Sequence, residues 1–246
     1  MNTVLTRQQR EWRNTSVLGV VAVIVSLTIW LSACSSASPH AKTKKAAAST
    51  TSSAAITEES VPTSLVNAGE YGENVYDYAK ANDWKNANVK VTALRDAAKT
   101  VRTDVKKQSG AVDRLDTNVA ALDRAVTAKD RQATMREANQ VTLDVADMTI
   151  AYKLSVPVEV TKLDYYGREL EVWAQAQDAN KLQATAREMR RTWDSLRPTI
   201  ATKNATEAKK FDALVSHVES AKSPGDYPRV ATLVLSEVDN LEKLFH

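Results

Sequence analysis

Side chains that commonly perform catalysis or bind metals are scarce in this chain. Its 246 residues include three histidines, His40, His217 and His246, and a single cysteine, Cys34. No Glu-x-x-His pair occurs, so the inward-facing Glu/His set of di-iron bundles cannot be assembled. A lone helical histidine such as His217 is far more often a surface or packed residue than a metal or haem ligand. We therefore expect no bound metal and no cofactor.

Paired carboxylates are the remaining candidates for acid–base chemistry. Glu169 and Glu171 form one such pair, and Asp144 and Asp147 form another. They lie in segments rich in charged residues, so we interpret them as solvated helix faces. No glycine-rich phosphate loop is present, and a nucleophile–base set would have to rely on His217 alone. The sequence therefore predicts a protein that is not an enzyme.

The residues that precede Cys34 have the order of an export signal. Arg7, Arg10 and Arg13 come first, an apolar segment from Val17 to Trp30 follows, and small residues end it. A basic flank, an apolar segment and small residues are typical of a secretory signal peptide. The arginines are expected to stay on the cytoplasmic side because moving them through hydrocarbon is costly.

The end of this segment resembles the lipobox of bacterial lipoproteins, in the order Leu31, Ser32, Ala33 and Cys34. The resemblance covers the leader alone. It implies that residues 1–33 are removed as a signal peptide and that the Cys34 thiol carries a diacylglycerol. The partner of such a group is the membrane, and the protein would be lipid-anchored on its extracytoplasmic face. Lipidation also accounts for a lone cysteine in an exported protein.

Two other fates of the apolar segment remain open. The segment approaches the lower length limit for spanning a bilayer, so it could persist as a transmembrane anchor. An ordinary signal peptidase could instead cut after Ala33 or Ala37 and release the protein.

The net positive charge is confined to the leader and to the segment that follows it. The formal net charge is +3, but residues 61–246 contain 27 basic and 27 acidic residues. Strong nucleic-acid binding relies on many phosphate-neutralising cations, so we expect no nucleic-acid partner. Residues 34–60 are rich in Ser, Ala and Thr and have almost no large apolar residue before Ile56. Such a segment is expected to be a flexible tether.

From residue 61 onward, apolar residues recur at steps of three and four, which is the period of an α-helix. Two such stripes are Ala87, Val91, Leu94, Ala98, Val101 and Val105, and Leu182, Ala186, Met189, Trp193, Leu196 and Ile200. Prolines, which suit the first turn, and capping side chains mark the expected helix starts. These starts are Pro62, Asp83, Asp130, Pro157, Asp178 and Asn204, and residues 223–226 break the chain before the last helix, which carries Tyr227.

The two stripes lie about 95 residues apart, position for position. Ten residues are also identical at this offset, namely those at 60–62, 71, 72, 79, 81, 83, 95 and 102 and their counterparts. We interpret the repeat as a tandem duplication. The predicted fold is all-α, a tandem pair of up-down four-helix bundles with units at 61–153 and 154–246. A single fused eight-helix body is the alternative.

Two features of the first helix of each unit depart from a plain bundle pattern. Gly72 and Gly167 lie on the apolar stripe, where glycine costs up to about 1 kcal/mol relative to alanine. They indicate close helix approach or, alternatively, a groove for a ligand. Aromatic residues gather on or just after the same helices and suit either a recognition patch or contacts between the units. These residues are Tyr71, Tyr76, Tyr78, Trp84, Tyr165, Tyr166 and Trp173.

The sequence thus favours a membrane-anchored extracytoplasmic lipoprotein with a non-enzymatic interaction or scaffold role. Its partner would be an envelope protein or a second copy of the chain. The alternative is a helical-bundle binding protein that holds a small apolar ligand in space left by Gly72 and Gly167.

Overall fold

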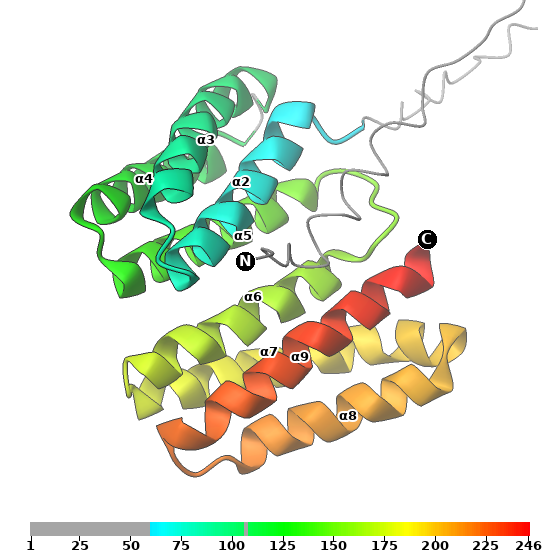
Figure 1. Ribbon diagram of the computed structural model, residues 1–246. Coiled ribbons are helices and arrows are strands. Elements are labelled where there is room, and N and C mark those ends of the chain that lie inside the picture. Colours follow the sequence, from blue (N-terminus) through cyan, green and yellow to red (C-terminus); the bar gives the residue numbers. More distant parts are fainter. Residues whose placement is uncertain (1–59, 106–107) are drawn as a thin grey trace, which may run out of the picture. The chain divides into compact units, whose positions relative to one another are not determined.

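The computed structural model describes residues 60–105 and 108–246, and this part of the chain is all-α, as predicted. The lipobox, the leader and nearly all of the tether lie outside the described residues. Within the described ranges there are eight α-helices, two short 3-10 helices and no strand (Figure 1). The elements are α2 (Thr63–Lys80), α3 (Trp84–Asp104), α4 (Ser109–Ala128), α5 (Arg131–Thr149), α6 (Val158–Gln175), α7 (Ala179–Lys203), α8 (Ala205–Ser220), η1 (Pro224–Asp226), α9 (Tyr227–Glu242) and η2 (Lys243–Phe245).

Side-chain caps begin four of these helices at the residues that the sequence predicted. The carboxylates of Asp83, Asp130 and Asp178 each accept a hydrogen bond from the backbone N–H three residues further on, at 3.0–3.1 Å. The side chain of Asn204 accepts from the backbone N–H groups of Thr206 and Glu207. Each cap pairs N–H groups that the first helical turn would otherwise leave without a partner.

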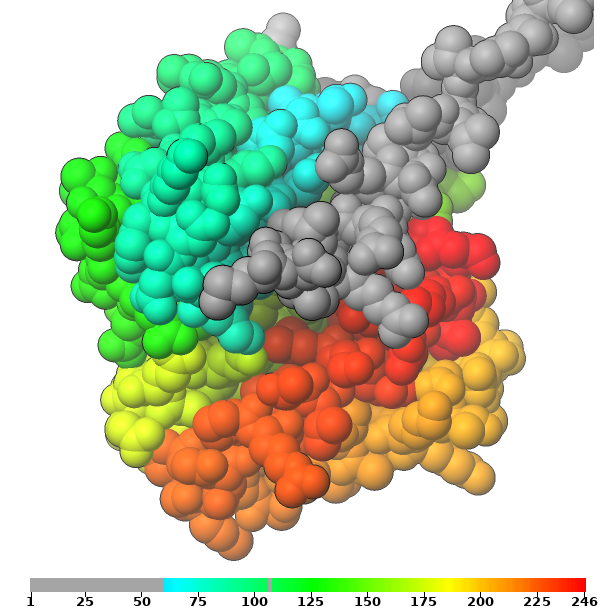
Figure 2. Space-filling view, viewed as in Figure 1, coloured from blue at the N-terminus to red at the C-terminus, as the bar shows by residue number. Residues whose placement is uncertain are grey.

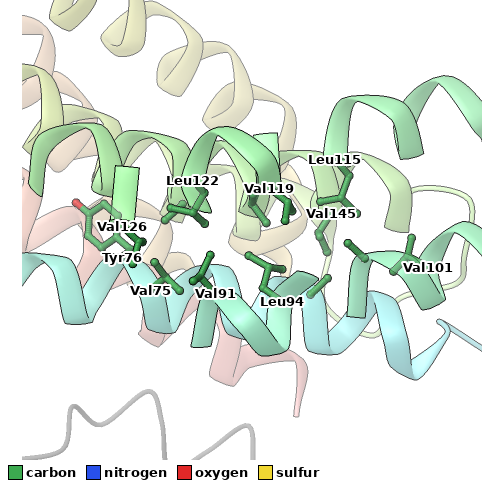
Figure 3. Close-up of a cluster of buried hydrophobic side chains, with 14 of the residues drawn as sticks. Val75, Tyr76, Val91, Leu94, Val101, Leu115, Val119, Leu122, Val126 and Val145 are labelled. Atoms are coloured by element: carbon green, nitrogen blue, oxygen red, sulfur yellow. The ribbon is translucent and has the colours of Figure 1, made fainter. Parts of the chain in front are cut away.

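Helices α2, α3, α4 and α5 surround one hydrophobic core. α2 packs beside α3 and α5, and α4 also packs beside both. The buried side chains come from all four helices and meet along the bundle interior (Figure 3). Those labelled in Figure 3 are Val75, Tyr76, Val91, Leu94, Val101, Leu115, Val119, Leu122, Val126 and Val145.

Helices α6, α7, α8 and α9 surround a second core. α6 packs beside α7 and α9, and α8 packs beside both α7 and α9. In the space-filling view α9, in red, lies directly beside α8, in orange (Figure 2). The largest fully buried side chain of this core is Trp193, whose ring centre lies 4.6 Å from that of Phe211.

α6 has more buried positions than an edge helix of a bundle would have, because it also packs against α5. Of its 18 residues, 11 are buried, and four of these are charged. α6, which carries Gly167, therefore contacts both groups of helices. Its buried charged residues lie at the centre of the candidate site.

Candidate functional site

The seven predicted aromatic residues are all at least partly buried. Tyr76 and Tyr165 are buried, and the other five are intermediate in exposure. Tyr71, Tyr78 and Trp84 pack against the first core, and Trp173 packs against both cores. Most of these rings pack on the core of their own helix group, and Tyr76 and Trp173 also contact the other group.

Both predicted close-approach glycines face a neighbouring helix. A Cβ atom on Gly72 would lie 3.1 Å from Val141 Cγ1 of α5. A Cβ atom on Gly167 would lie 2.6 Å from Leu235 Cδ2 of α9. Side chains of the next helix therefore occupy the space that each glycine leaves, which is the geometry of close helix packing.

We expect Gly72→Leu to lower the free energy of unfolding by about 1–3 kcal/mol or more, since a leucine would be forced against the stiff Val141 side chain. Gly110→Leu is the matched control, because a Cβ at Gly110 in α4 meets no atom within 4 Å. There the leucine meets no neighbour and lies in the first turn of α4, so stability should change by less than about 0.5 kcal/mol. Urea denaturation followed by circular dichroism measures both changes, and equal effects at the two sites would contradict this account.

Buried and partly buried polar contacts join α6 to α2 and α5. We call this region the seam and define it by nine residues. They are Glu73, Tyr76, Asp77 and Lys80 of α2, Asn139 of α5, and Asp164, Arg168, Glu169 and Glu171 of α6.

Arg168 lies at the centre of the seam and is only 2% exposed. Its Nε lies 2.9 Å from Asp164 Oδ2, one helical turn earlier, and its Nη2 lies 3.9 Å from Glu73 Oε2 on α2. The guanidinium also stacks on the ring of Tyr76, 5.1 Å from the ring centre. Burial disfavours the charged form, but Asp164, Glu73 and Asp77 together hold the pKa of Arg168 above its ordinary value.

Glu171 is the second junction between α2 and α6. The Tyr76 hydroxyl donates to Glu171 Oε2 at 2.9 Å, and Lys80 Nζ lies 2.6 Å from the same oxygen and 2.8 Å from Oε1. Burial and the nearby Glu171 carboxylate raise the pKa of Tyr76 well above its ordinary value. The hydroxyl therefore stays protonated and remains a donor.

Asn139 makes the corresponding junction between α5 and α6. Its Nδ2 donates to the Tyr165 backbone carbonyl at 3.1 Å and to Glu169 Oε1 at 3.0 Å. The other Glu169 oxygen accepts from the indole N–H of Trp173. Burial raises the pKa of Glu169, and the hydrogen bonds from Asn139 and Trp173 offset part of that rise.

The interpretation of the paired acids as solvated helix faces is wrong for three of the four. Glu169 and Glu171 are 8% exposed and Asp144 is 3% exposed. Asp144 accepts a hydrogen bond from Asn118 of α4, and Asp147 pairs with Lys162 of α6 at 2.8 Å. The polar face of a helix meets water only if no other helix packs against it, and here α5 and α6 pack against each other.

Arg168, Glu73 and Asp164 were missed as site residues by the sequence interpretation. The one local signal is the spacing of Asp164 and Arg168, four residues apart, which allows an ion pair on one face of the helix. His217 is exposed on α8, as expected of a lone helical histidine. Across the described ranges, no group of three or more His, Cys, Asp or Glu side chains is placed to hold a metal ion.

Two surface ion pairs occur at equivalent places in the two helix groups. Each joins an arginine of the second helix to an acid of the third, and the counterparts lie 95 or 96 residues apart. The pairs are Arg95–Asp123 (3.2 Å) with Arg190–Glu219 (2.7 Å), and Arg102–Asp116 (2.5 Å) with Arg197–Asp212 (2.7 Å).

The turn after the first helix is also repeated. Asn82 and Gln177, 95 residues apart, both have φ of 56°, in the left-handed region. Counterparts at this spacing also meet across the seam. Tyr76 bonds to Glu171, its own counterpart, and Glu73 faces Arg168, which lies at the same spacing.

No protein-family model, no curated protein and no solved structure matches this chain. In the part of the chain that the structure describes, no helix is long and apolar enough to cross a membrane.

Proposed function

We propose that this chain is a lipoprotein tethered to the extracytoplasmic face of a bacterial membrane, where its helical body acts as a non-enzymatic scaffold. The single observation that carries the location is the order Leu31, Ser32, Ala33 and Cys34 after an apolar segment, in a chain with no other cysteine. Residues 1–33 would be removed, and 34–60 would link the lipidated Cys34 to the body.

The body, in this proposal, is a tandem pair of up-down four-helix bundles, at 61–153 and 154–246, that arose by duplication. The repeated ion pairs, the repeated turn at Asn82 and Gln177, and the two separate cores support it. Short connections such as Lys129–Asp130 between α4 and α5 suit antiparallel neighbours.

A scaffold role is the interaction role that the geometry favours. The aromatic side chains that could have formed an exposed recognition patch are all at least partly buried, and Tyr76 and Trp173 take part in polar contacts with α6 carboxylates. A body braced in this way is suited to hold an envelope partner, or a second copy, at a fixed place outside the membrane.

A groove for a small apolar ligand is less well supported. It would need open space beside Gly72 and Gly167, whereas Val141 and Leu235 lie against those positions. The geometry therefore supports the scaffold role better than ligand binding.

We expect Cys34→Ala to abolish labelling of the protein by radioactive palmitate and to leave an uncut precursor in membranes, because the thiol is the acceptor of the lipid. Crosslinking in intact cells, compared between the wild type and this variant, tests the role. The adducts of the wild type with envelope proteins or with itself should be lost or changed in the variant. Unchanged labelling would refute the lipoprotein proposal and leave the transmembrane anchor. Unchanged adducts would show that the interaction does not depend on the lipid anchor.

A further inference from the structure

The seam encloses more carboxylates than cations. Four acids surround the contact of α2 with α6, namely Glu73, Asp77, Asp164 and Glu171. The two cations among them are Arg168 and Lys80. Removing charged groups from water is costly unless each finds a close partner of opposite charge. Here the two cations are too few for the four acids, and they lie closer to some of the acids than to others.

Glu73 is the carboxylate that faces Arg168 across the contact, and it is only weakly compensated. Lys80 is bound closely to Glu171, and Arg168 lies 2.9 Å from Asp164 but 3.9 Å from Glu73. On its own helix Glu73 has Glu70 and Asp77 as neighbours, and both are acids. The Glu73 side chain keeps 23% of its exposure, so a proton from solvent can reach it.

The charged groups with the largest effect on Glu73 lie on α2 and α6 rather than on the other helices packed on α2. From α3, Lys90 Nζ lies 4.8 Å from the centre of the Tyr71 ring, and Asp104 accepts a hydrogen bond from Ser64. α5 faces α2 through the apolar side chain of Val141. The charge on Glu73 is therefore determined by α2 itself and by α6.

We propose that the seam is a proton-controlled contact, closed while Glu73 holds a proton and loosened between α2 and α6 when that proton is lost. With Glu73 neutral, the two cations face three ionised acids; with Glu73 ionised, they face four. The added negative charge repels Asp77 and Asp164 across a poorly hydrated contact. Separation of α2 from α6 lets water solvate it.

The direction of the pH response follows from the pKa of Glu73. Burial raises this pKa from 4.5 to about 7, Arg168 lowers it in part, and Asp164, Asp77 and Glu70 raise it further. A carboxyl whose pKa is raised in the closed state stabilises that state fully below pH 4.5, and the stabilisation is lost as the pH rises through about 7. The equilibrium constant for opening is expected to rise by up to about seventyfold between pH 5 and pH 8.

The test uses the full-length chain with spin labels on the outer helices α4 and α8, at Ala120→Cys and Lys209→Cys, in a Cys34→Ser background. Both positions are exposed. Distances between the labels, measured by double electron–electron resonance, should show a second, longer population that grows from pH 5 to pH 8. Glu73→Gln, which imitates the protonated acid, should remove this growth. Asp96→Asn, which deletes an exposed acid of the same helix group, should leave it unchanged.

Urea unfolding at the same pH values provides a second measurement. Wild-type stability should fall from pH 5 to pH 8 by an amount that Glu73→Gln abolishes. A label distance that does not change with pH, together with an unfolding curve that responds equally in both proteins, would overturn the proposal. The result does not depend on how the chain is anchored, so it can fail while the lipoprotein proposal stands.

Discussion

Replacing Arg168 with methionine is expected to lower the free energy of unfolding by about 3–5 kcal/mol, since it removes the cation and leaves buried carboxylates behind. Arg168 is 2% exposed and pairs with Asp164, which is itself 5% exposed. Methionine keeps much of the side-chain length, so the loss of stability is due more to the missing charge than to altered packing. Chemical denaturation at pH 7.5 measures the change.

Two further variants separate the charge from other effects. Arg191→Met removes an arginine whose side chain is 71% exposed and which pairs only with Glu188 one turn away, so it should cost less than about 0.5 kcal/mol. The double variant Arg168→Met with Asp164→Leu deletes both charges of the buried pair and should recover part of the loss. An equal loss for Arg168→Met and Arg191→Met would show that the seam has no special energetic role.

Replacing Trp193 with alanine is expected to cost about 3–5 kcal/mol, because it opens a large cavity in the second core. Trp193 is fully buried, packs on Phe211, and donates from its indole nitrogen to Asp212 at 2.8 Å. Trp193→Phe keeps most of the volume and loses the hydrogen bond, so a smaller cost of about 1 kcal/mol is expected.

Trp84→Ala is the control for the tryptophan prediction. Trp84 begins α3 and lies at the edge of the first core with intermediate exposure, so its removal leaves a shallow gap that water can fill. Thermal unfolding followed by circular dichroism should show a clearly smaller loss than for Trp193→Ala. The reverse order would mean that the second core is not organised around Trp193.

Local patterns determined the helices well enough to be predicted. The apolar steps of three and four gave the faces that pack in the two cores, and Asp83, Asp130, Asp178 and Asn204 begin helices where a capping side chain was expected. These features depend on residues within one or two turns of each other. They can therefore be predicted from the spacing of residues in the sequence.

The seam could not be predicted in the same way. Helical spacing divides a helix into an apolar stripe and a polar back, and it assigns Glu169 and Glu171 to the back. Whether that back meets water depends on which other helices cover it, and for α6 these are α5 and α2, from the other group. The burial of Arg168 is a property of this tertiary contact. For the same reason, the aromatic residues could be assigned either to a recognition patch or to an internal contact.

The meeting of counterparts across the seam has a consequence for how the two halves recognise each other. In a two-fold symmetric dimer, residues near the axis meet their own copies. Tyr76 and Glu171 are 95 residues apart and bond to each other, as two such copies would. Two copies of the first half would place Glu73 against Glu73, and two copies of the second would place Arg168 against Arg168. Only the unlike pair brings opposite charges together. If the two halves arose by duplication, as proposed, their divergence would favour pairing of unlike halves at this contact over pairing of like halves.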